Sequence, residues 1–236
     1  MAMTYSASGR SQANSQSAKD PGILEVAGIL VDHISHFDAA SRIKVSQSPT
    51  LDSSEEEVLD NIESTLRGAI KEQPSSNLSS LDFCKSDALW KTLVTNRSLF
   101  GSAHIAGPKT PAPIEYGKMF EVFRNRSRIP TRFKPELPHP QRKQEYVKPF
   151  VSSMELGDQR FFITLGGHIG LGPHQLRRDD MVVLIFGADM PFVLRSRGTH
   201  HQLIGPSYVH GIMDGEGLKS KTKAELKQSM ISFTLK

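Results

Sequence analysis

The last third of the chain, residues 159–236, has the densest alternation of apolar and polar positions. Short runs of Val, Ile, Leu and Phe are separated there by breaks that contain Gly, Pro or Asp, about every eight to twelve residues. This spacing is typical of an antiparallel sheet that closes on itself. We therefore predict a small antiparallel β-barrel of SH3-like or OB-like size, without intervening helices, from the strands Arg160–Leu165, His168–Leu171, Met181–Phe186, Phe192–Arg195, His201–Ile204, Ser207–Met213 and Ile231–Leu235.

The glycine-rich stretch Gly166–Gly172 has two interpretations. Gly166 and Gly167 can form a tight hairpin turn, because glycine adopts positive φ without steric cost. The backbone of such a stretch can also bind phosphate. We favour the hairpin, because Pro173 and a polar turn follow instead of Gly-Lys-Ser/Thr and a helix.

The N-terminal part contains one strand pattern behind a polar tail. Residues 1–20 are dominated by Ser, Ala, Gln, Asn and Gly, and these side chains bury too little apolar surface to offset the entropy of ordering. We predict that residues 1–20 are a disordered tail. Ile23–His33 then alternates imperfectly, with a change of phase at Gly28 that is typical of a bulged strand. We expect this strand to join the C-terminal barrel across a long insertion.

The insertion has helical periodicity. Apolar residues spaced three and four apart predict the amphipathic helices Glu55–Lys71, Ser86–Arg97 and Glu115–Asn125. Ile129–Pro149 holds five prolines without a clear period, so we predict an irregular crossing there. The fold class is thus α+β. Residues 21–158 form the N-terminal strand and the helical insertion with mobile linkers, residues 159–236 form the barrel, and the two make one composite domain, 21–236.

Charge is distributed unevenly along the chain. Asp20–Thr65 contains ten acidic residues and two basic ones, whereas Gly117–Lys148 contains nine basic residues and three acidic ones. One interpretation of the basic stretch is a nucleic-acid-binding patch formed by Arg124, Arg126, Arg128 and Arg132. The other is a solvated face that pairs with the acidic stretch. We favour the second, because no RNA-recognition, zinc-finger or helix-turn-helix pattern is present.

Few residues have the spacing of a chemical site. His210, Asp214 and Glu216 would share one face of an extended strand, where they could hold a hard metal ion or act as acid and base in hydrolysis. Asp214-Gly215 is also a favoured turn dipeptide, and His210 can form a structural hydrogen bond. We favour these structural roles. With Tyr208, the three residues are our candidates for a binding site, and we predict no catalytic residue, metal or other cofactor.

Several phrases in the last third resemble the C-terminal region of fungal heterokaryon incompatibility (HET) domain proteins. They are Gly170–Pro173, Asp180–Phe186, Pro191–Arg195 and, above all, the nine residues Tyr208–Glu216. The packing of a β-barrel does not require this particular sequence of nine residues, so the match is specific. The family's N-terminal HET domain, which carries the cell-death activity, has no counterpart in this sequence. The resemblance implies a non-catalytic regulatory or protein-interaction module in self/non-self recognition, or the product of a truncated gene.

Composition adds a cellular setting to this picture. The 236 residues include one cysteine, and neither an N-terminal apolar segment nor a run of eighteen apolar residues occurs. We therefore expect a cytoplasmic protein that does not enter the membrane. The partner implied by the resemblance is another protein, such as one with a HET domain, rather than nucleic acid.

Overall fold

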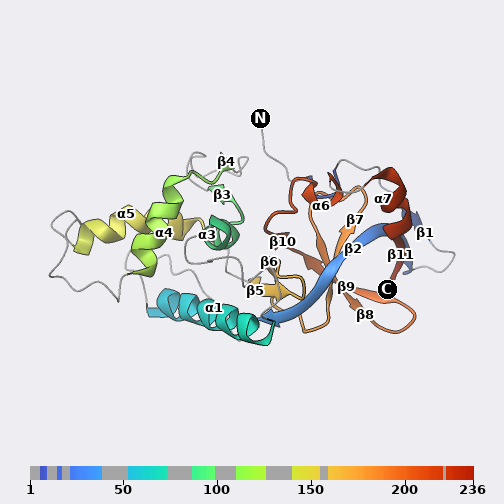
Figure 1. The fold of residues 1–236 in the computed structure, drawn as a ribbon, viewed down its shortest axis with the longest axis horizontal. Coiled ribbons are helices and arrows are strands. Elements are labelled where there is room, and N and C mark those ends of the chain that lie inside the picture. Colours follow the sequence, from blue (N-terminus) through green and yellow to red (C-terminus); the bar gives the residue numbers. More distant parts are fainter. Residues whose placement is uncertain are drawn as a thin grey trace.

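The computed structural model describes residues 6–9, 15–17, 22–38, 53–73, 87–98, 110–125, 140–154, 159–219 and 222–236. These residues form two parts, with helices α3, α4 and α5 gathered at one end and a twisted sheet at the other (Figure 1). Helix α1 reaches from the helical part to the sheet, where it contacts β2 and β5. The mixed α+β class predicted from the sequence is therefore confirmed.

The elements follow one another in a simple order along the chain. They are β1 (Ser15–Ser17), β2 (Leu24–Phe37), α1 (Ser53–Glu72), α3 (Asp87–Leu93), β3 (Arg97–Ser98), β4 (Thr110–Pro111), α4 (Glu115–Arg124), α5 (Pro140–Ser152), β5 (Gln159–Thr164), β6 (Ile169–Pro173), β7 (Met181–Ile185), β8 (Phe192–Ser196), β9 (His201–Pro206), β10 (Tyr208–Val209), α6 (Glu216–Lys219), α7 (Lys223–Ser229) and β11 (Met230–Leu235).

Strand β2 organises the sheet. Its 14 residues pair in turn with β11, β7 and β5, and its first residues also pair with β1. Gly28 is needed for close approach, because a Cβ atom there would lie 2.6 Å from the Leu184 carbonyl oxygen. The predicted bulge at Gly28 is misplaced: the register shifts lie between Leu30 and Asp32 and between Ile34 and His36.

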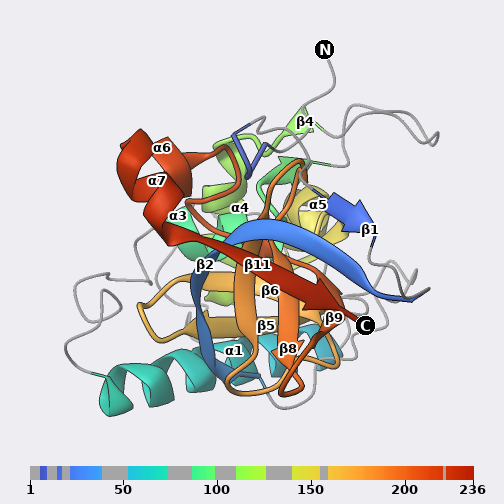
Figure 2. The same ribbon diagram turned by 90° about the vertical axis from the view of Figure 1, so that its right-hand side faces the viewer.

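The strand pairings form an uneven ring. They lead from β2 to β11, β9, β8, β7 and back to β2, and all but one of these contacts are antiparallel ladders. The exception is β11 with β9, which are parallel and joined by the single bridge Leu235–His201. Figure 2 shows β11 lying beside β2 and meeting β9 near the C-terminus. Strands β5, β6 and β10 extend the sheet from the far end of β2.

The hairpin predicted at Gly166-Gly167 joins β5 to β6. Gly167 has a φ of 89°, and the Thr164 N–H donates to the His168 carbonyl oxygen at 2.9 Å. The Gly166 N–H donates to Asp32 Oδ2 at 2.6 Å, which attaches the turn to β2. The backbone groups of Gly166 and Gly167 thus form the hairpin and attach it to β2, as the hairpin interpretation predicted.

Two of the three predicted helices have close to their predicted lengths. Helices α1 and α4 match the expected segments within a few residues, whereas α3 ends at Leu93, well before the predicted Arg97. The chain leaves the helix because Thr95 and Asn96 adopt φ values of 50° and 51°. Positive φ is outside the right-handed helical region. The predicted mobile linkers fall mostly outside the described residues.

Helix α5 corrects the prediction of an irregular crossing at Ile129–Pro149. Pro140 occupies the first helical position, where a missing N–H has little cost, and Pro149 lies near the end. Val147, Phe150 and Val151 are buried, at the spacing of one helix face. The prolines concealed this short apolar stripe. Residues 129–139 of the predicted crossing lie outside the described residues.

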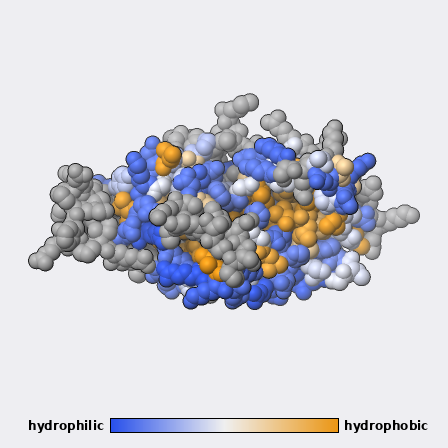
Figure 3. Space-filling model, viewed as in Figure 1, coloured by the Kyte–Doolittle hydropathy of each residue, from blue (hydrophilic) through white to orange (hydrophobic). Residues whose placement is uncertain are grey.

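One hydrophobic core joins the helices to the sheet. The Phe150 ring lies 5.8, 5.8 and 6.2 Å from the rings of Tyr116, Phe120 and Phe123, in edge-on and tilted arrangements that aromatic pairs prefer. The same cluster continues through α3 to the sheet residues Phe161, Ile163, Ile169, Leu171 and Tyr208. A separate cluster with Ile34, Phe162, Val182, Leu184 and Val193 lies within the sheet. The helical insertion is therefore packed on the sheet, as predicted. Figure 3 shows the surface of the molecule in the view of Figure 1, with apolar residues gathered over the sheet part.

Two further differences concern the chain ends. Helices α6 and α7 lie between β10 and β11, so the strands of the last third do have helices between them. Within the predicted disordered tail, residues 15–17 pair with β2 and Ala7 is completely buried. Composition missed this because small residues can fit against a sheet without supplying a core of their own. None of the helices in the described ranges combines the length and the apolar character needed to cross a bilayer.

Candidate functional site

The nine-residue phrase Tyr208–Glu216 begins as a strand and becomes a turn. Only Tyr208 and Val209 form β10, and they pair with Leu171 and Gly170 of β6. The predicted strand Ser207–Met213 is too long, because Gly211 has a φ of 82° and the chain reverses direction there. His210, Asp214 and Glu216 therefore do not alternate along one strand, and the shared face predicted for them does not form.

The segment Gly170–Pro173 belongs to β6, the strand with which β10 pairs. A Cβ atom at Gly170 would collide with the Tyr208 carbonyl oxygen and would lie 2.6 Å from Phe162 Cζ. A Cβ atom at Gly172 would lie 3.1 Å from Leu176 and 3.2 Å from Phe162. Gly170 is thus required for the close approach of β10 to β6, and Gly172 leaves little room beside Leu176 and Phe162.

Asp214, Gly215 and Glu216 form a turn that holds the N-terminal segment. The Asp214 N–H donates to Glu216 Oε2 at 2.6 Å, and Gly215 has a φ of 80°. A Cβ atom at Gly215 would lie 3.2 Å from Gly9 Cα, and the Ser6 N–H donates to the Met213 carbonyl oxygen at 3.0 Å. These contacts are the structural roles that the turn dipeptide Asp214-Gly215 suggested.

His210 lies at the junction between this turn, the sheet and α3. Its backbone N–H donates to the Ile169 carbonyl oxygen at 2.9 Å, and its Nδ1 lies 3.4 Å from the Tyr208 hydroxyl. Burial lowers the pKa of His210, and the nearby charge of Lys91 lowers it further, while Glu216 and Asp87 oppose the shift. The imidazole is therefore neutral at neutral pH.

The first turn of α3 supplies the charged groups near His210. Asp87 accepts hydrogen bonds from Trp90 Nε1 at 3.1 Å and from Lys91 Nζ at 2.9 Å. Both bonds lower the pKa of the Asp87 carboxyl, and the bond from Lys91 has the larger effect. The junction thus places the neutral His210 near the charged groups of Asp87, Lys91 and Glu216. Throughout the described residues, no three His, Cys, Asp or Glu side chains gather closely enough to hold a metal ion.

The predicted basic patch is described only at Arg124. Its Nε donates to Glu63 Oε1 at 2.6 Å, and the side chains of Arg124 and Glu63 are 12% and 10% exposed. Glu63 belongs to the acidic stretch, so this contact agrees with the pairing that we favoured over nucleic-acid binding. Arg126, Arg128 and Arg132 lie outside the described residues.

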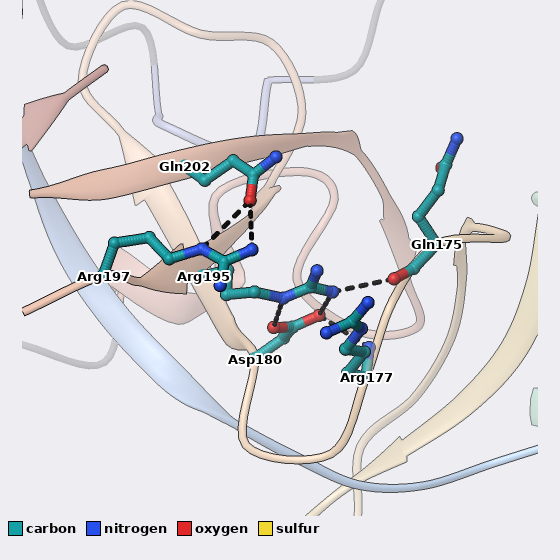
Figure 4. A network of polar contacts seen from close by, with 6 residues as sticks. All are labelled: Gln175, Arg177, Asp180, Arg195, Arg197 and Gln202. Carbon is teal, nitrogen blue, oxygen red and sulfur yellow. Dashed lines mark hydrogen bonds and ion pairs between the residues drawn. The ribbon is translucent and has the colours of Figure 1, made fainter.

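Sequence reasoning missed a polar network in the sheet around Asp180 and Arg195 (Figure 4). The two side chains form a bidentate ion pair, with Nε–Oδ1 and Nη2–Oδ2 distances of 2.8 and 2.9 Å, and the hydrogen bonds raise the pKa of Arg195. Asp180 also accepts the Arg177 N–H at 2.6 Å, and Arg195 donates to the Gln175 carbonyl oxygen at 2.7 Å. The network fixes the loop between β6 and β7 against β8.

A signal for this network was present in the hairpin pattern. Met181 pairs with Leu194, which places the preceding Asp180 beside the following Arg195. Pairing the two predicted strands in that register would have brought the opposite charges together. Both residues also belong to the phrases that carry the family resemblance.

Comparison with known proteins supports that resemblance. Residues 142–227 match the Het-6 beta-barrel domain, a range that runs from α5 into α7. A stretch of 62 residues is 40% identical to heterokaryon incompatibility protein 6, OR allele, of Neurospora crassa, and it covers 25% of this chain. The match spans only 9% of the Neurospora protein. No solved structure matches the chain.

The family match falls on the region that contains β5 to β10 and the phrase Tyr208–Glu216. The C-terminal region of this chain is therefore similar to a part of heterokaryon incompatibility proteins.

Proposed function

We propose that this protein is a non-catalytic regulatory or protein-interaction module of heterokaryon incompatibility, acting in fungal self/non-self recognition and programmed cell death. The observation that carries the proposal is the match of residues 142–227 to the Het-6 beta-barrel domain, together with the Neurospora relative. We propose that this module is located in the cytoplasm. We also propose that the uneven ring of strands acts as a small barrel that presents surfaces to a partner.

A non-catalytic role fits the geometry of the candidate residues. Asp214 and Glu216 are joined in a turn, and the charges that act on His210 come from Glu216 as well as from Asp87 and Lys91 of α3. A general acid or base must reach the reacting atoms together with its partner groups. We keep His210, Asp214 and Glu216 as candidates for a recognition surface, whereas Tyr208 is only 2% exposed and belongs to the core.

Nucleic-acid binding is the alternative that the sequence left open, and Arg124 disfavours it. Phosphate contacts need cationic side chains that are free to displace counterions. The Arg124 guanidinium instead lies between helices, against Glu63. Binding to a basic patch would fall steeply with salt, so the absence of salt-dependent binding to duplex and single-stranded DNA would support the protein-partner proposal.

The partner we propose is a full-length heterokaryon incompatibility protein. The test is co-purification of the tagged chain with Neurospora heterokaryon incompatibility protein 6, produced together in the same cells. The control is the variant Gly170→Leu, in which the new side chain would collide with Tyr208 and Phe162 and displace β10. We expect a stoichiometric complex with the parent chain and a much weaker one with the variant.

A second measurement tests the biological role. Expression of the chain in a fungal strain that carries a heterokaryon incompatibility gene should change the frequency of growth arrest after fusion with an incompatible strain. If neither a complex nor a change in growth arrest is seen, with the full-length protein present, the proposed function is wrong.

A further inference from the structure

Among the described residues, strand β11 is fully paired along only one of its two edges. On one side, all six residues from Met230 to Leu235 pair with β2. On the other side, the described strands offer a single pairing, that of Leu235 with His201. The backbone of Met230–Thr234 on this second side is called the open β11 edge below.

The orientation of the backbone groups at this edge follows from one hydrogen bond. The Lys236 N–H donates to the His201 carbonyl oxygen at 3.0 Å, so the Lys236 N–H points away from β2. Backbone N–H and C=O groups alternate sides along a strand. Therefore Thr234, Ser232 and Met230 direct their N–H groups to the open edge, while Leu235, Phe233 and Ile231 direct theirs to β2.

The open β11 edge lacks the features with which sheets usually protect an edge. Strand β9, which also has a free side among the described strands, carries Pro206 and a register shift, and both discourage strand addition. Strand β11 contains neither proline nor charge, and it exposes Met230 by 47% and Ile231 by 41%. Unpaired backbone groups next to exposed apolar side chains are suited to an extended segment that adds as a strand.

Charge limits what that segment can be. Lys227 and Lys236 are exposed near the two ends of β11. A second copy of this chain, pairing antiparallel through the same edge, would bring Lys236 of one copy beside the Ser229 end of the other, close to Lys227. Like charges in that position oppose pairing, whereas acidic residues at the ends of the added segment would be attracted.

We propose that the open β11 edge binds an extended segment of a partner protein in which apolar residues alternate with acidic ones. The inference rests on the proposed function, because it identifies where the interaction module takes its partner. The segment pairs its main chain with Met230, Ser232 and Thr234, and its side chains cover Met230. Five residues of open edge are enough for one strand of average length.

The experiment uses the full chain and two variants at Ser232. Ser232→Pro removes the N–H that points to the open edge and leaves the hydrogen bonds to β2, whereas Ser232→Ala keeps that N–H. The probe is a short synthetic peptide that alternates valine and glutamate, compared with the same peptide carrying lysine for glutamate. Fluorescence anisotropy measures binding, and thermal unfolding checks that each variant is folded.

We expect the parent chain and Ser232→Ala to bind the glutamate peptide equally and the lysine peptide at least tenfold more weakly. Ser232→Pro should weaken binding of the glutamate peptide about tenfold, because one hydrogen bond is lost and the ring clashes with the added strand. If Ser232→Pro does not fold, Ser232→Glu and Ser232→Lys replace it, since the exposed side chain tolerates both. Ser232→Glu should weaken and Ser232→Lys strengthen binding of the glutamate peptide.

Three results would overturn the inference. The first is equal binding by the parent chain and the Ser232→Pro variant, or by the two charge variants. The second is no binding of the glutamate peptide at all. The third is a dimer of the parent chain, seen by analytical ultracentrifugation and lost in the Ser232→Pro variant, because the edge would then hold a second copy.

Amide hydrogen exchange gives an independent readout in the free protein. Ser232 and Thr234 amides should exchange much faster than those of Phe233 and Leu235, and equal protection would contradict an open edge. The co-purification experiment keeps the two proposals apart. A complex with the Neurospora protein that survives Ser232→Pro would overturn the edge as the docking site and leave the proposed function intact.

Discussion

Two buried ion pairs among the described residues, one in the sheet and one between helices, are built differently. In the sheet, Asp180 and Arg195 are 2% and 12% exposed and meet through two parallel hydrogen bonds. Between helices, Glu63 of α1 and Arg124 of α4 are similarly buried and meet through one short bond, from Nε to Oε1. Glu63 has a second cation, Arg67, one turn along α1.

The difference shows what each pair stabilises. Asp180 and Arg195 are close in sequence, and each makes one further bond to the loop between β6 and β7, Asp180 accepting from the Arg177 N–H and Arg195 donating to the Gln175 carbonyl. This pair therefore fixes a local loop within a hairpin. Glu63 and Arg124 are far apart in sequence, and their contact sets the position of one helix against another. The sheet pair has further hydrogen bonds within its own loop, whereas the helical pair has a substitute cation within reach.

The largest expected effect tests the sheet pair. Arg195→Met should lower the free energy of unfolding by about 3–5 kcal/mol, because it leaves a buried carboxylate without its cation. Urea unfolding followed by circular dichroism measures this. Arg197→Met is the matched control, since Arg197 is exposed and bonds only to the exposed Gln202 among the described partners, so its loss should cost within about 0.5 kcal/mol. Equal losses for the two substitutions would contradict the expectation that the buried ion pair stabilises the fold more than the exposed bonds of Arg197 do.

A smaller loss is expected for the helical pair. Arg124→Met should cost about 1–3 kcal/mol, because Arg67 can still pair with Glu63. The same urea experiment gives the value, and Lys118→Met on the exposed side of α4 serves as the control. The double variant Arg67→Met with Arg124→Met should lose more than the sum of the single losses. Strict additivity of the single variants would show that Arg67 is no substitute.

The junction between the two regions should respond to pH. The folded-state pKa of His210 is lowered below its ordinary value of 6.5, so the folded protein binds fewer protons than the unfolded chain at acidic pH. The stability that this histidine contributes is complete above about pH 7 and is lost as pH falls through 6.5 toward the folded pKa.

The test compares unfolding free energies of the parent chain and of His210→Gln between neutral and mildly acidic pH. His210→Gln should flatten the decline, and His200→Gln on the sheet surface is the control. A decline that is unchanged in His210→Gln would remove this residue from the pH response.

The smallest effect is expected where α1 touches the sheet through exposed charges. Glu72 Oε2 lies 3.0 Å from His36 Nε2 and 3.3 Å from Arg178 Nη2, and the side chains of Glu72 and Arg178 are largely exposed. Glu72→Gln should change the unfolding free energy by less than about 1 kcal/mol, and high salt should cancel the change. A loss as large as that of Arg124→Met would mean that exposure does not separate strong pairs from weak ones in this protein.

Strands were predictable where alternation and turn residues agreed. Met181–Phe186 and Phe192–Arg195 were located within a residue, because continuous apolar runs between glycines and aspartates leave few alternatives. Ser207–Met213 was predicted too long, because the positive φ of Gly211 turns the chain inside an apolar run. Helix α5 was missed, because its two prolines outweighed a buried stripe of three residues.

The candidate site was less predictable than the fold. His210, Asp214 and Glu216 are close in sequence, but the chain turns at Gly211 and again at Asp214–Glu216, so their side chains do not share one strand face. The alternation of apolar and polar residues does not predict such turns. The Asp180–Arg195 pair could have been found only after the hairpin register was known. The spacing of apolar residues therefore located the strands, whereas the contacts between side chains depended on the register of strand pairing.

The long strand β2 has a consequence for how the protein is made. It leaves the ribosome early, yet its partners β5, β7 and β11 are synthesised only after the whole helical insertion. Until then its apolar residues have no sheet to join, so the nascent chain depends on chaperones or on slow closure of a long loop. An excised fragment limited to residues 142–227 would lack both β2 and β11, and we expect it to aggregate during expression.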